Sequence, residues 1–268
     1  MSEPITSPGN ERIKRLVRLR ERRDRQREGV ILLDELRVVR RALEAGLVMD
    51  EAYACPEVLA EHCGGELLED LRRSGIEIVE VTPRVLEKAA YRAKPEGLIV
   101  VAQPPAWSLD KLALPPEPLV LVLEGVEKPG NLGAVVRTAS GAGVAAVLAC
   151  GAGADPWNPN ALRASTGAVF TVPTVSAGAA QILEFLRACG IPLLATTPAA
   201  PDLHTACDLT GPVAVLLGAE DTGLSSEMLA AADRRCRIPM LGTADSLNVS
   251  VAAALLAYEA LRQRSARR

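Results

Sequence analysis

The stretch of this sequence that decides its fold is IPMLGTADSLNVSVAAALLAYE, residues 238–259. A short apolar segment, residues 235–239, leads into a glycine-containing loop that ends in Ser-Leu-Asn at 246–248, and a long apolar helix pattern follows. Polar residues at the start of such a helix are poor core material, and the free backbone N–H groups there can bind a carboxylate or a polar ligand. The stretch therefore predicts a ligand site at the start of the C-terminal helix.

Two earlier segments also run from a buried strand into a glycine turn with polar residues. They are EKPGNLGAVVRTA at 127–139 and LLGAEDTGLS at 216–225. Together with residues 238–259 they resemble, in the same order, the three signature motifs of the SpoU (TrmH) branch of the SPOUT RNA methyltransferases. One such match is weak, but three in order are specific. The resemblance is strong over residues 119–264 and loose before them.

The composition predicts a cytoplasmic protein. The chain has 268 residues, enough for one large domain or two ordinary ones, and its 49% apolar content is ample for a buried core. It has no apolar run of about 18 residues that would span a membrane, and its N-terminus lacks the apolar core of a signal peptide. Six scattered cysteines without a CxxC pair and only two histidines predict neither disulfides nor a metal site.

The charge is unevenly distributed along the chain. A net charge of −3 argues against a uniformly basic nucleic-acid binder, but residues 1–30 hold nine Lys or Arg against five acids. Two interpretations of this basic arm stay open. It is either a solvated helix surface on which Glu and Arg support each other, or a segment that contacts RNA.

Proline and glycine residues divide the chain into two α/β domains. Residues 1–102 form a small N-terminal domain that begins with the basic arm, residues 103–118 are a proline-rich linker, and residues 119–268 form the C-terminal domain. In the C-terminal domain apolar strands alternate with helices, which predicts a parallel sheet covered on both faces. The expected strands are 119–123, 145–149, 192–196, 213–217 and 235–239, and the expected helices are 132–142, 159–166, 177–189, 225–232 and 249–264.

General rules of chain connection predict an open, doubly wound sheet and disfavour knots. The resemblance implies more, namely a parallel-sheet SPOUT domain with a deep trefoil knot near its C-terminal end. It also implies that the N-terminal domain binds the RNA substrate.

Asn131 and Arg137 are the candidate catalytic residues of the first motif. Asn131 suits a helix N-cap, so capping alone could explain it. Arg137 lies on an otherwise apolar helix, where its guanidinium needs either an internal carboxylate or a phosphate as partner. The resemblance maps both residues onto positions that serve RNA binding and catalysis. It adds three candidates from the other motifs, which could otherwise be a solvated carboxylate and two helix caps: Glu220, Ser246 and Asn248.

The resemblance implies an S-adenosylmethionine site between the second and third motifs. Gly218 follows an apolar strand and would let a ligand approach the backbone closely. Thr196 ends another strand, where parallel sheets commonly bind ligands. Plain core packing is the alternative for the apolar members. The candidate cofactor-binding residues are Thr196, Leu217, Gly218, Ile238, Met240 and Leu247.

Two loops resemble RNA-contacting segments of the family. RAKPEG at 92–97 places two cations in a Pro/Gly loop, and NPNALRAST at 158–166 is rich in polar residues. Chance could supply the first loop, and helix capping with a solvated surface explains the second nearly as well. The candidate RNA-binding residues are Arg92, Lys94, Asn160, Arg163 and Ser165.

These features predict an S-adenosylmethionine-dependent RNA 2′-O-ribose methyltransferase that acts on 23S ribosomal RNA. The alternatives are a tRNA 2′-O-methyltransferase and an RNA- or ribosome-binding relative without catalysis. A dehydrogenase is disfavoured, because the glycine-rich residues 141–146 follow a helix and precede a strand, the reverse of a dinucleotide fingerprint. Helix 249–264 is apolar nearly all round and must be buried on more than one side. The resemblance implies a homodimer formed through this domain.

Overall fold

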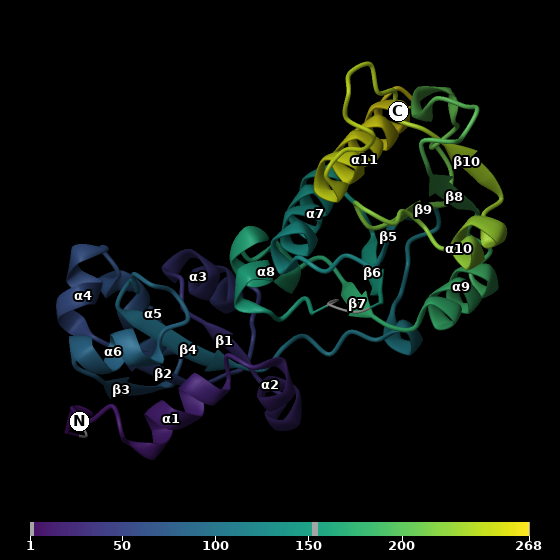
Figure 1. Cartoon of the computed structure of the whole chain (residues 1–268). Coiled ribbons are helices and arrows are strands. Elements are labelled where there is room, and N and C mark those ends of the chain that lie inside the picture. Colours follow the sequence, from purple (N-terminus) through teal and green to yellow (C-terminus); the bar gives the residue numbers. More distant parts are fainter. Residues whose placement is uncertain (1–2, 152–154, 268) are drawn as a thin grey trace. The chain divides into compact units, whose positions relative to one another are not determined.

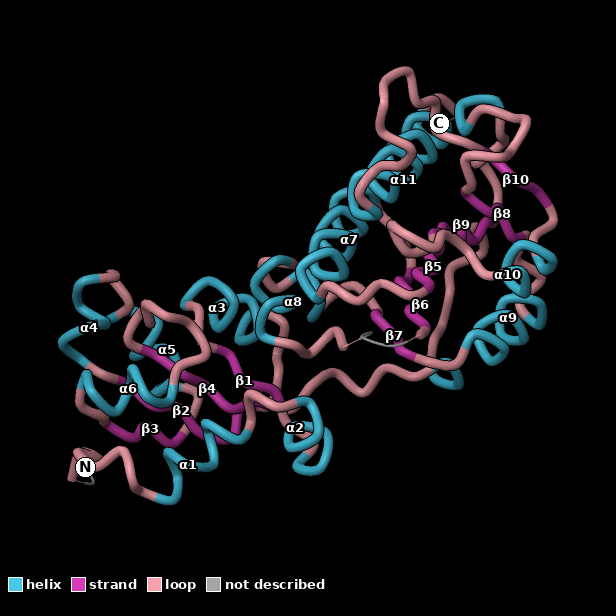
Figure 2. The backbone as a smooth tube through the Cα atoms, in the orientation of Figure 1, coloured by secondary structure: helices cyan, strands magenta, loops and turns pink. Residues whose placement is uncertain are grey.

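The structure, a computed structural model, describes residues 3–151 and 155–267 (Figures 1 and 2). The chain forms two compact units. The N-terminal unit comprises Met1–Ala106 with Trp157–Phe170, and the C-terminal unit comprises Trp107–Pro156 with Thr171–Arg268. Sequence analysis expects a division near residues 103–118 but does not anticipate that Trp157–Phe170 groups with the N-terminal unit. No helix in the described ranges is long and apolar enough to cross a membrane.

The N-terminal unit is built on a mixed four-stranded sheet with the order β1-β4-β2-β3. The central strand β4 (Leu98–Ala102) is buried at every position and runs antiparallel to β1 (Ile31–Leu33) and β2 (Met49–Ala54). Strand β3 (Glu77–Glu80) runs parallel to β2. Strand β2 has the sequence MDEAYA, in which two acids interrupt the apolar pattern that would mark a buried strand. The helices are α3 (Leu36–Glu44), α4 (Pro56–Glu61), α5 (Gly65–Arg73), α6 (Pro83–Ala89) and α8 (Pro159–Ala164).

The basic arm folds as two short helices, α1 (Glu11–Arg18) and α2 (Arg22–Glu28). The Asn10 side chain accepts a hydrogen bond from the Arg12 N–H and so caps α1. Ile13 and Leu16, one turn apart, are fully buried in the core of the N-terminal unit. The arm is therefore an integral part of the folded domain.

The C-terminal unit contains a six-stranded sheet with the order β10-β8-β9-β5-β6-β7, and every pair of neighbouring strands is parallel. The predicted strands are all present, and β7 is an additional edge strand of three residues. The strands are β5 (Leu119–Glu124), β6 (Ala146–Cys150), β7 (Thr174–Ser176), β8 (Leu193–Thr196), β9 (Val213–Leu217) and β10 (Arg234–Cys236).

Helices cover both faces of this sheet (Figure 1). On one side α7 (Pro129–Ala142) packs against α11 (Val249–Ser265), which also contacts β5 and β9. On the other side lie α9 (Ala179–Ala188) and α10 (Ser226–Ala231), whose apolar residues join the core beneath the strands. Trp107, at the predicted linker, packs against this same core. The α/β fold class is confirmed, and the trefoil knot stays a prediction.

The carboxyl ends of four neighbouring strands lie along one edge of the sheet. Strands β5, β9, β8 and β10 end at Glu124, Leu217, Thr196 and Cys236. Parallel sheets bind their ligands outside this edge. All three sequence motifs begin there, so the fold brings them together.

Candidate active site

Three polar side chains, one from each motif, form a hydrogen-bonded cluster. Glu220 follows β9, Asn131 lies in the first turn of α7, and Asn248 precedes α11. The Glu220 Oε1 accepts from Asn131 Nδ2 at 2.8 Å and from Asn248 Nδ2 at 2.6 Å. Asn248 Nδ2 also lies 3.2 Å from Asn131 Oδ1. Asn131 is 89 positions from Glu220 and 117 positions from Asn248 in the sequence, and these hydrogen bonds hold the three side chains in one orientation.

Helix capping explains only one of these residues. The N-cap of α7 is Lys128, and Asn131 makes no cap, so the capping interpretation of Asn131 is wrong. Asn248 does cap α11, since its Oδ1 accepts from the Ser250 N–H at 2.9 Å. Its side-chain nitrogen remains available for Glu220. Ser246 is not a cap either, because its hydroxyl lies 3.4 Å from the Glu220 carbonyl oxygen.

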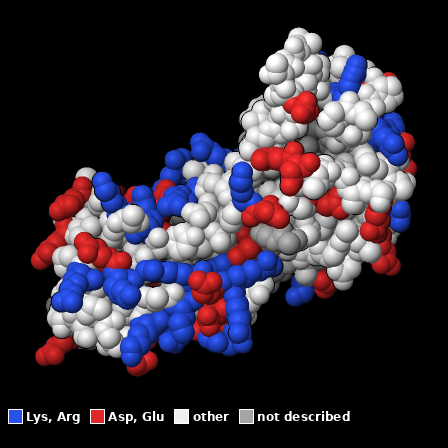
Figure 3. Space-filling view, viewed as in Figure 1, with Lys and Arg blue, Asp and Glu red and all other residues white. Residues whose placement is uncertain are grey.

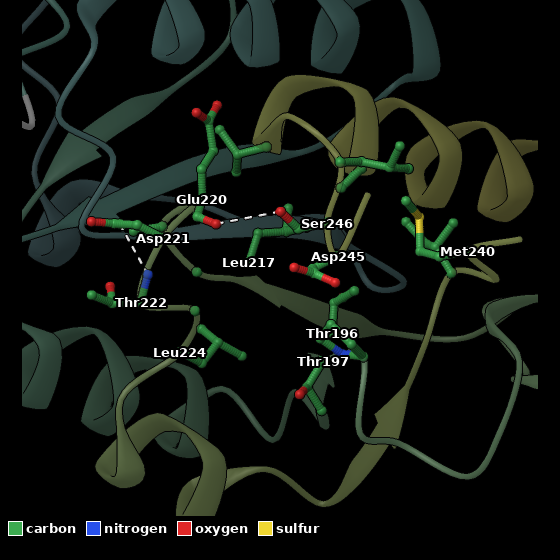
Figure 4. A pocket seen from close by; sticks show the side chains of 18 of the residues that line it. Thr196, Thr197, Leu217, Glu220, Asp221, Thr222, Leu224, Met240, Asp245 and Ser246 are labelled. Atoms are coloured by element: carbon green, nitrogen blue, oxygen red, sulfur yellow. Dashed lines mark hydrogen bonds between the residues drawn. The ribbon is translucent and has the colours of Figure 1, made fainter. Parts of the chain in front are cut away.

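A cavity of about 410 Å³ opens beside this cluster (Figure 4). All six residues predicted to bind the cofactor line it, together with Glu220 and Ser246. In Figure 4 the Glu220 side chain extends away from the side on which Thr196 and Asp245 lie. The cavity is also lined by residues that the sequence did not single out, although three of the four lie within the second and third motifs: Asp221, Leu224, Asp245 and Leu229.

The loop after β9 requires a glycine at position 218. A Cβ atom at this position would lie 2.1 Å from the Gly223 carbonyl carbon, so any side chain would force the backbone of residues 223–224 away. Gly218 also lines the cavity, and its contact with a ligand stays a prediction. The loop closes on itself through a hydrogen bond from the Gly223 N–H to the Ala219 carbonyl at 3.0 Å.

Glu124 fixes the far end of the same loop. Its Oε2 accepts a hydrogen bond from the Ser225 N–H at 2.7 Å. Ser225 in turn caps α10 by accepting from the Met228 N–H at 3.2 Å. The end of β5 therefore holds residues 218–225 in place, a role that sequence analysis did not assign to Glu124.

A second cavity of about 250 Å³ adjoins the first. The two share Ala219, Glu220, Asp221 and Val249 as lining residues. The second is also lined by Asn131 and by Lys128, whose Nζ lies 3.8 Å from Glu220 Oε2. Glu220 of the polar cluster thus lines both cavities, and Asn131 lines the second.

Arg137 lies apart from this cluster within the chain. It is exposed and lines neither cavity. Six residues along α7 correspond to about 9 Å of helix rise, with a rotation that turns Arg137 away from the face of Asn131. Within residues 3–151 and 155–267, Arg137 has no hydrogen bond or ion pair, so the interpretation as an internal ion pair is wrong. Its guanidinium is free for a partner outside the chain.

The predicted RNA-binding residues form a separate group within the N-terminal unit. Arg92 pairs with Glu96, and Asn160 donates to the Tyr91 hydroxyl at 3.0 Å while it accepts from Arg163. Lys94 is exposed. Ser165 is fully buried, and its hydroxyl donates to the Leu162 carbonyl at 2.8 Å. This burial corrects the expectation that Ser165 contacts RNA, because the side chain stabilises the turn after α8.

The larger cavity suits S-adenosylmethionine. Its volume falls within the roughly 300–1,000 Å³ typical of small-molecule sites. Apolar side chains such as Ile238, Met240 and Leu247 could pack against an adenine, and the acids Asp221 and Asp245 suit a cation. In the described part of the chain, no group of three His, Cys, Asp or Glu residues is placed to hold a metal ion.

Comparison with known proteins agrees with this geometry. Residues 118–258, which contain all three motifs, match the SpoU rRNA Methylase family. The chain belongs to this family. Residues 10–100 match the MRM3-like substrate binding domain. The resemblance stated from the sequence is thereby confirmed.

Individual relatives cover most of the chain. The 23S rRNA (guanosine-2′-O-)-methyltransferase RlmB of Vibrio parahaemolyticus is 36% identical over 75% of this chain and 83% of its own length. A crystal structure of an RNA 2′-O ribose methyltransferase is 42% identical with a TM-score of 0.84, and it covers 98% of this chain and 100% of its own. The SpoU methyltransferase AviRb of Streptomyces viridochromogenes in complex with AdoMet is 29% identical with a TM-score of 0.86, over 96% and 98% of the two chains.

Proposed function

We propose that this protein methylates a ribose 2′-hydroxyl of 23S ribosomal RNA with S-adenosylmethionine as the methyl donor. The observation that carries the proposal is the Asn131–Glu220–Asn248 cluster, whose Glu220 lines both a cavity fit for the donor and a second, adjacent cavity. Membership of the SpoU family and the 23S rRNA methyltransferases among the relatives support the same reaction and substrate. A ribosomal substrate would place the reaction in the cytoplasm.

When bound, S-adenosylmethionine would supply the methyl group for the ribose oxygen, leaving as S-adenosylhomocysteine, and the hydroxyl proton would pass to water. The residues of this chain position the hydroxyl. Glu220 fixes the amides of Asn131 and Asn248, which leaves polar atoms presented toward the second cavity in a set geometry. Such preorganisation contributes to catalysis because the groups need not reorient as the reaction proceeds.

Arg137 binds the phosphate next to the target ribose and polarises its hydroxyl. A guanidinium matches the geometry of a phosphate and does not give up its proton, which makes it a poor base. Because Arg137 lies apart from the cluster in its own chain, it acts on the site of a second copy. The active unit is therefore a homodimer with shared sites.

The surface of α11 supports such a dimer. Val251, Leu255 and Tyr258, spaced by four and three residues, are 46%, 41% and 52% exposed on one side of the helix. The opposite side, with Ala253, Leu256 and Ala257, is fully buried against the chain's own core. Helix α11 is thus apolar on two sides, of which only one is covered by its own chain. The exposed apolar side suits burial against another copy.

Tritium-labelled methyl donor tests the reaction. The protein is incubated with 23S rRNA, 16S rRNA and tRNA, and the labelled nucleoside is identified after digestion. The proposal predicts a 2′-O-methylnucleoside in 23S rRNA. Label in tRNA alone would mean that tRNA, and not 23S rRNA, is the substrate of the same methylation reaction. A protein that binds S-adenosylmethionine but labels none of these RNAs would contradict the proposed reaction.

A further inference from the structure

The arginines of the basic arm fall into two structural classes, and the difference locates a binding surface. We propose that α1 and α2 bind the phosphate backbone of the RNA substrate through Arg18, Arg22 and Arg23. The proposal rests on the proposed function, because it takes RNA as the partner. Beyond the proposed function, it identifies a surface away from the methyl-transfer site that holds this RNA.

The first class of arm arginines anchors the arm to its own domain. Arg12 Nη2 lies 2.7 Å from Glu51 Oε2 and 2.9 Å from Glu77 Oε1. Arg15 pairs with Glu28 at 2.7 Å and also with Glu51. These arginines are not available to a ligand without loss of the contacts that hold α1 on the sheet.

Arg20 and Arg25 anchor the arm through backbone carbonyls. Arg20 donates to the carbonyls of Lys88, at 2.5 Å, and Ala90, at the end of α6. Arg25 is 3% exposed and donates to the carbonyls of Leu19, at 3.1 Å, and Arg20, at 2.6 Å. Both side chains thus stabilise the path of the chain between α1 and α2.

Most acids of the arm are already paired. Glu11 pairs with Lys14 at 2.7 Å, and Asp24 pairs with Arg27 at 2.6 Å. Glu28, as noted, pairs with Arg15. The remaining acid of α1 and α2 and their junction is the exposed Glu21, which has no ion pair within the described residues.

The second class consists of Arg18, Arg22 and Arg23. All three are exposed, and among the described residues none has a side-chain hydrogen bond or an ion pair. Arg37 and Arg84 of this unit are likewise exposed without an ion pair in the described ranges, but each is isolated on its own helix, whereas three other exposed arginines pair with an acid on their own helix. Arg41 pairs with Glu44, Arg72 with Glu69, and Arg73 with Asp70. Three unpaired guanidinium groups against one acid leave a local excess of positive charge.

This excess continues onto the neighbouring elements. Helix α1 packs against α6, and the Arg20 bonds place the arm beside the residues that lead to the 91–96 loop. Lys88 and Lys94, on α6 and in this loop, are exposed. Figure 3 shows Lys and Arg gathered over the α1–α2 side of the N-terminal unit, with a few acids among them.

The chemistry of the surface fits a nucleic-acid backbone. Guanidinium groups bind phosphate oxygens through two parallel hydrogen bonds, and rigid anchoring of α1 and α2 holds them in place. The large apolar residues exposed in the described chain lie outside α1 and α2, so the arm offers no apolar surface for membrane insertion or a protein interface. Contact with phosphate alone carries no sequence information, and the surface therefore positions the RNA.

A charge-matched pair of triple variants tests the proposal in the full-length protein. One variant carries Arg18→Gln, Arg22→Gln and Arg23→Gln. The control carries Arg41→Gln, Arg72→Gln and Arg73→Gln, which removes the same charge from paired arginines of the same unit. A third variant carries Arg18→Lys, Arg22→Lys and Arg23→Lys and keeps the charge. Binding of a fluorescein-labelled RNA hairpin is measured by anisotropy over a salt series without methyl donor, and S-adenosylmethionine binding is measured by calorimetry.

We expect the arm variant to bind the hairpin about tenfold to a hundredfold more weakly at low salt, with a salt slope smaller by about two to three, because each lost phosphate contact retains its counterion. The control and the Lys variant should keep the slope, and all should bind S-adenosylmethionine normally. An unchanged slope in the arm variant, or an equal loss in the control, would overturn the proposal. Since no turnover is measured, these outcomes do not depend on the methyl-transfer reaction. Failure of the proposed function would instead appear as absent methylation by a protein that binds RNA normally.

Discussion

The C-terminal cavities and the N-terminal loops show two different relations between a sequence pattern and a site. In the C-terminal unit all six predicted cofactor residues line one cavity, and Asn131, Glu220 and Asn248 meet beside it. In the N-terminal unit most of the predicted RNA-binding residues are engaged with one another or with neighbours, as Arg92 is with Glu96. A set of motifs at the ends of several strands therefore predicts a site well. A single basic or polar loop does not show whether its side chains are available to bind a ligand.

The difference follows from what each pattern constrains. The three motifs begin at the carboxyl ends of parallel strands, so the topology alone brings them to one edge. Whether an arginine is free depends on acids far away in the sequence, such as Glu51, which lies 39 residues from Arg12. Whether an arginine side chain is available to a ligand therefore depends on the tertiary structure. The variants below test this in each region.

Arg137→Ala should have the largest effect on activity. It removes a free, exposed guanidinium, so methyl transfer should fall by about 10² to 10³, as when a charged transition-state contact is lost. Unfolding free energy should change by no more than about 0.5 kcal/mol. Single-turnover assays and thermal melts measure the two effects. Near-normal turnover would show that the free arginine is not catalytic.

Glu220→Ala should be the next most damaging change. The two asparagine amides lose their common acceptor, and activity should fall by about tenfold to a hundredfold because the site is no longer preorganised. Glu220→Gln keeps one oxygen that can accept from both amides and should lose much less. Equal losses in the two variants would mean that the charge of Glu220, rather than its hydrogen bonds, is required.

Glu124→Ala tests the anchored loop of the larger cavity. The Ser225 N–H loses its carboxylate acceptor, which should weaken S-adenosylmethionine binding by about fivefold to tenfold, equivalent to a hydrogen bond of about 1 kcal/mol. Calorimetric titration gives the affinity, and Glu124→Gln, which retains an acceptor, is the control. An unaltered affinity in the Ala variant would show that the loop needs no such anchor.

Glu51→Gln tests the anchored class of arm residues. Burial by itself raises the pKa of Glu51, but hydrogen bonds from Arg12 and Tyr53 and the charges of Arg12 and Arg15 outweigh it and hold the pKa below its usual 4.5. Because the folded pKa is lowered, ionised Glu51 stabilises the fold above about pH 4.5, and this contribution is lost as the pH falls through the folded value. The variant should be less stable by about 1–3 kcal/mol at neutral pH. Denaturant unfolding should show that difference shrinking below pH 4.5; a constant difference would argue against the ionised network.

The sequence was sufficient for the sheet, the motifs and the residues that line the larger cavity, because buried apolar strands and glycine turns leave strong local signals. It was insufficient for β2, where Asp50 and Glu51, the latter paired with the arm, interrupt the apolar pattern. It misjudged Ser165, whose hydroxyl is satisfied inside a turn. Such contacts depend on atoms that the local pattern does not specify.

A mixed dimer of Arg137→Ala and Glu220→Ala subunits tests the central claim, that the C-terminal site is completed by a second copy. The two chains are co-expressed with different affinity tags and purified in sequence, so that only mixed dimers remain. Each mixed dimer would hold one site with both residues intact, so we expect about half the wild-type methylation per dimer, whereas each parent is nearly inactive. A mixed dimer as inactive as its parents, or a monomer that methylates RNA, would contradict the shared site.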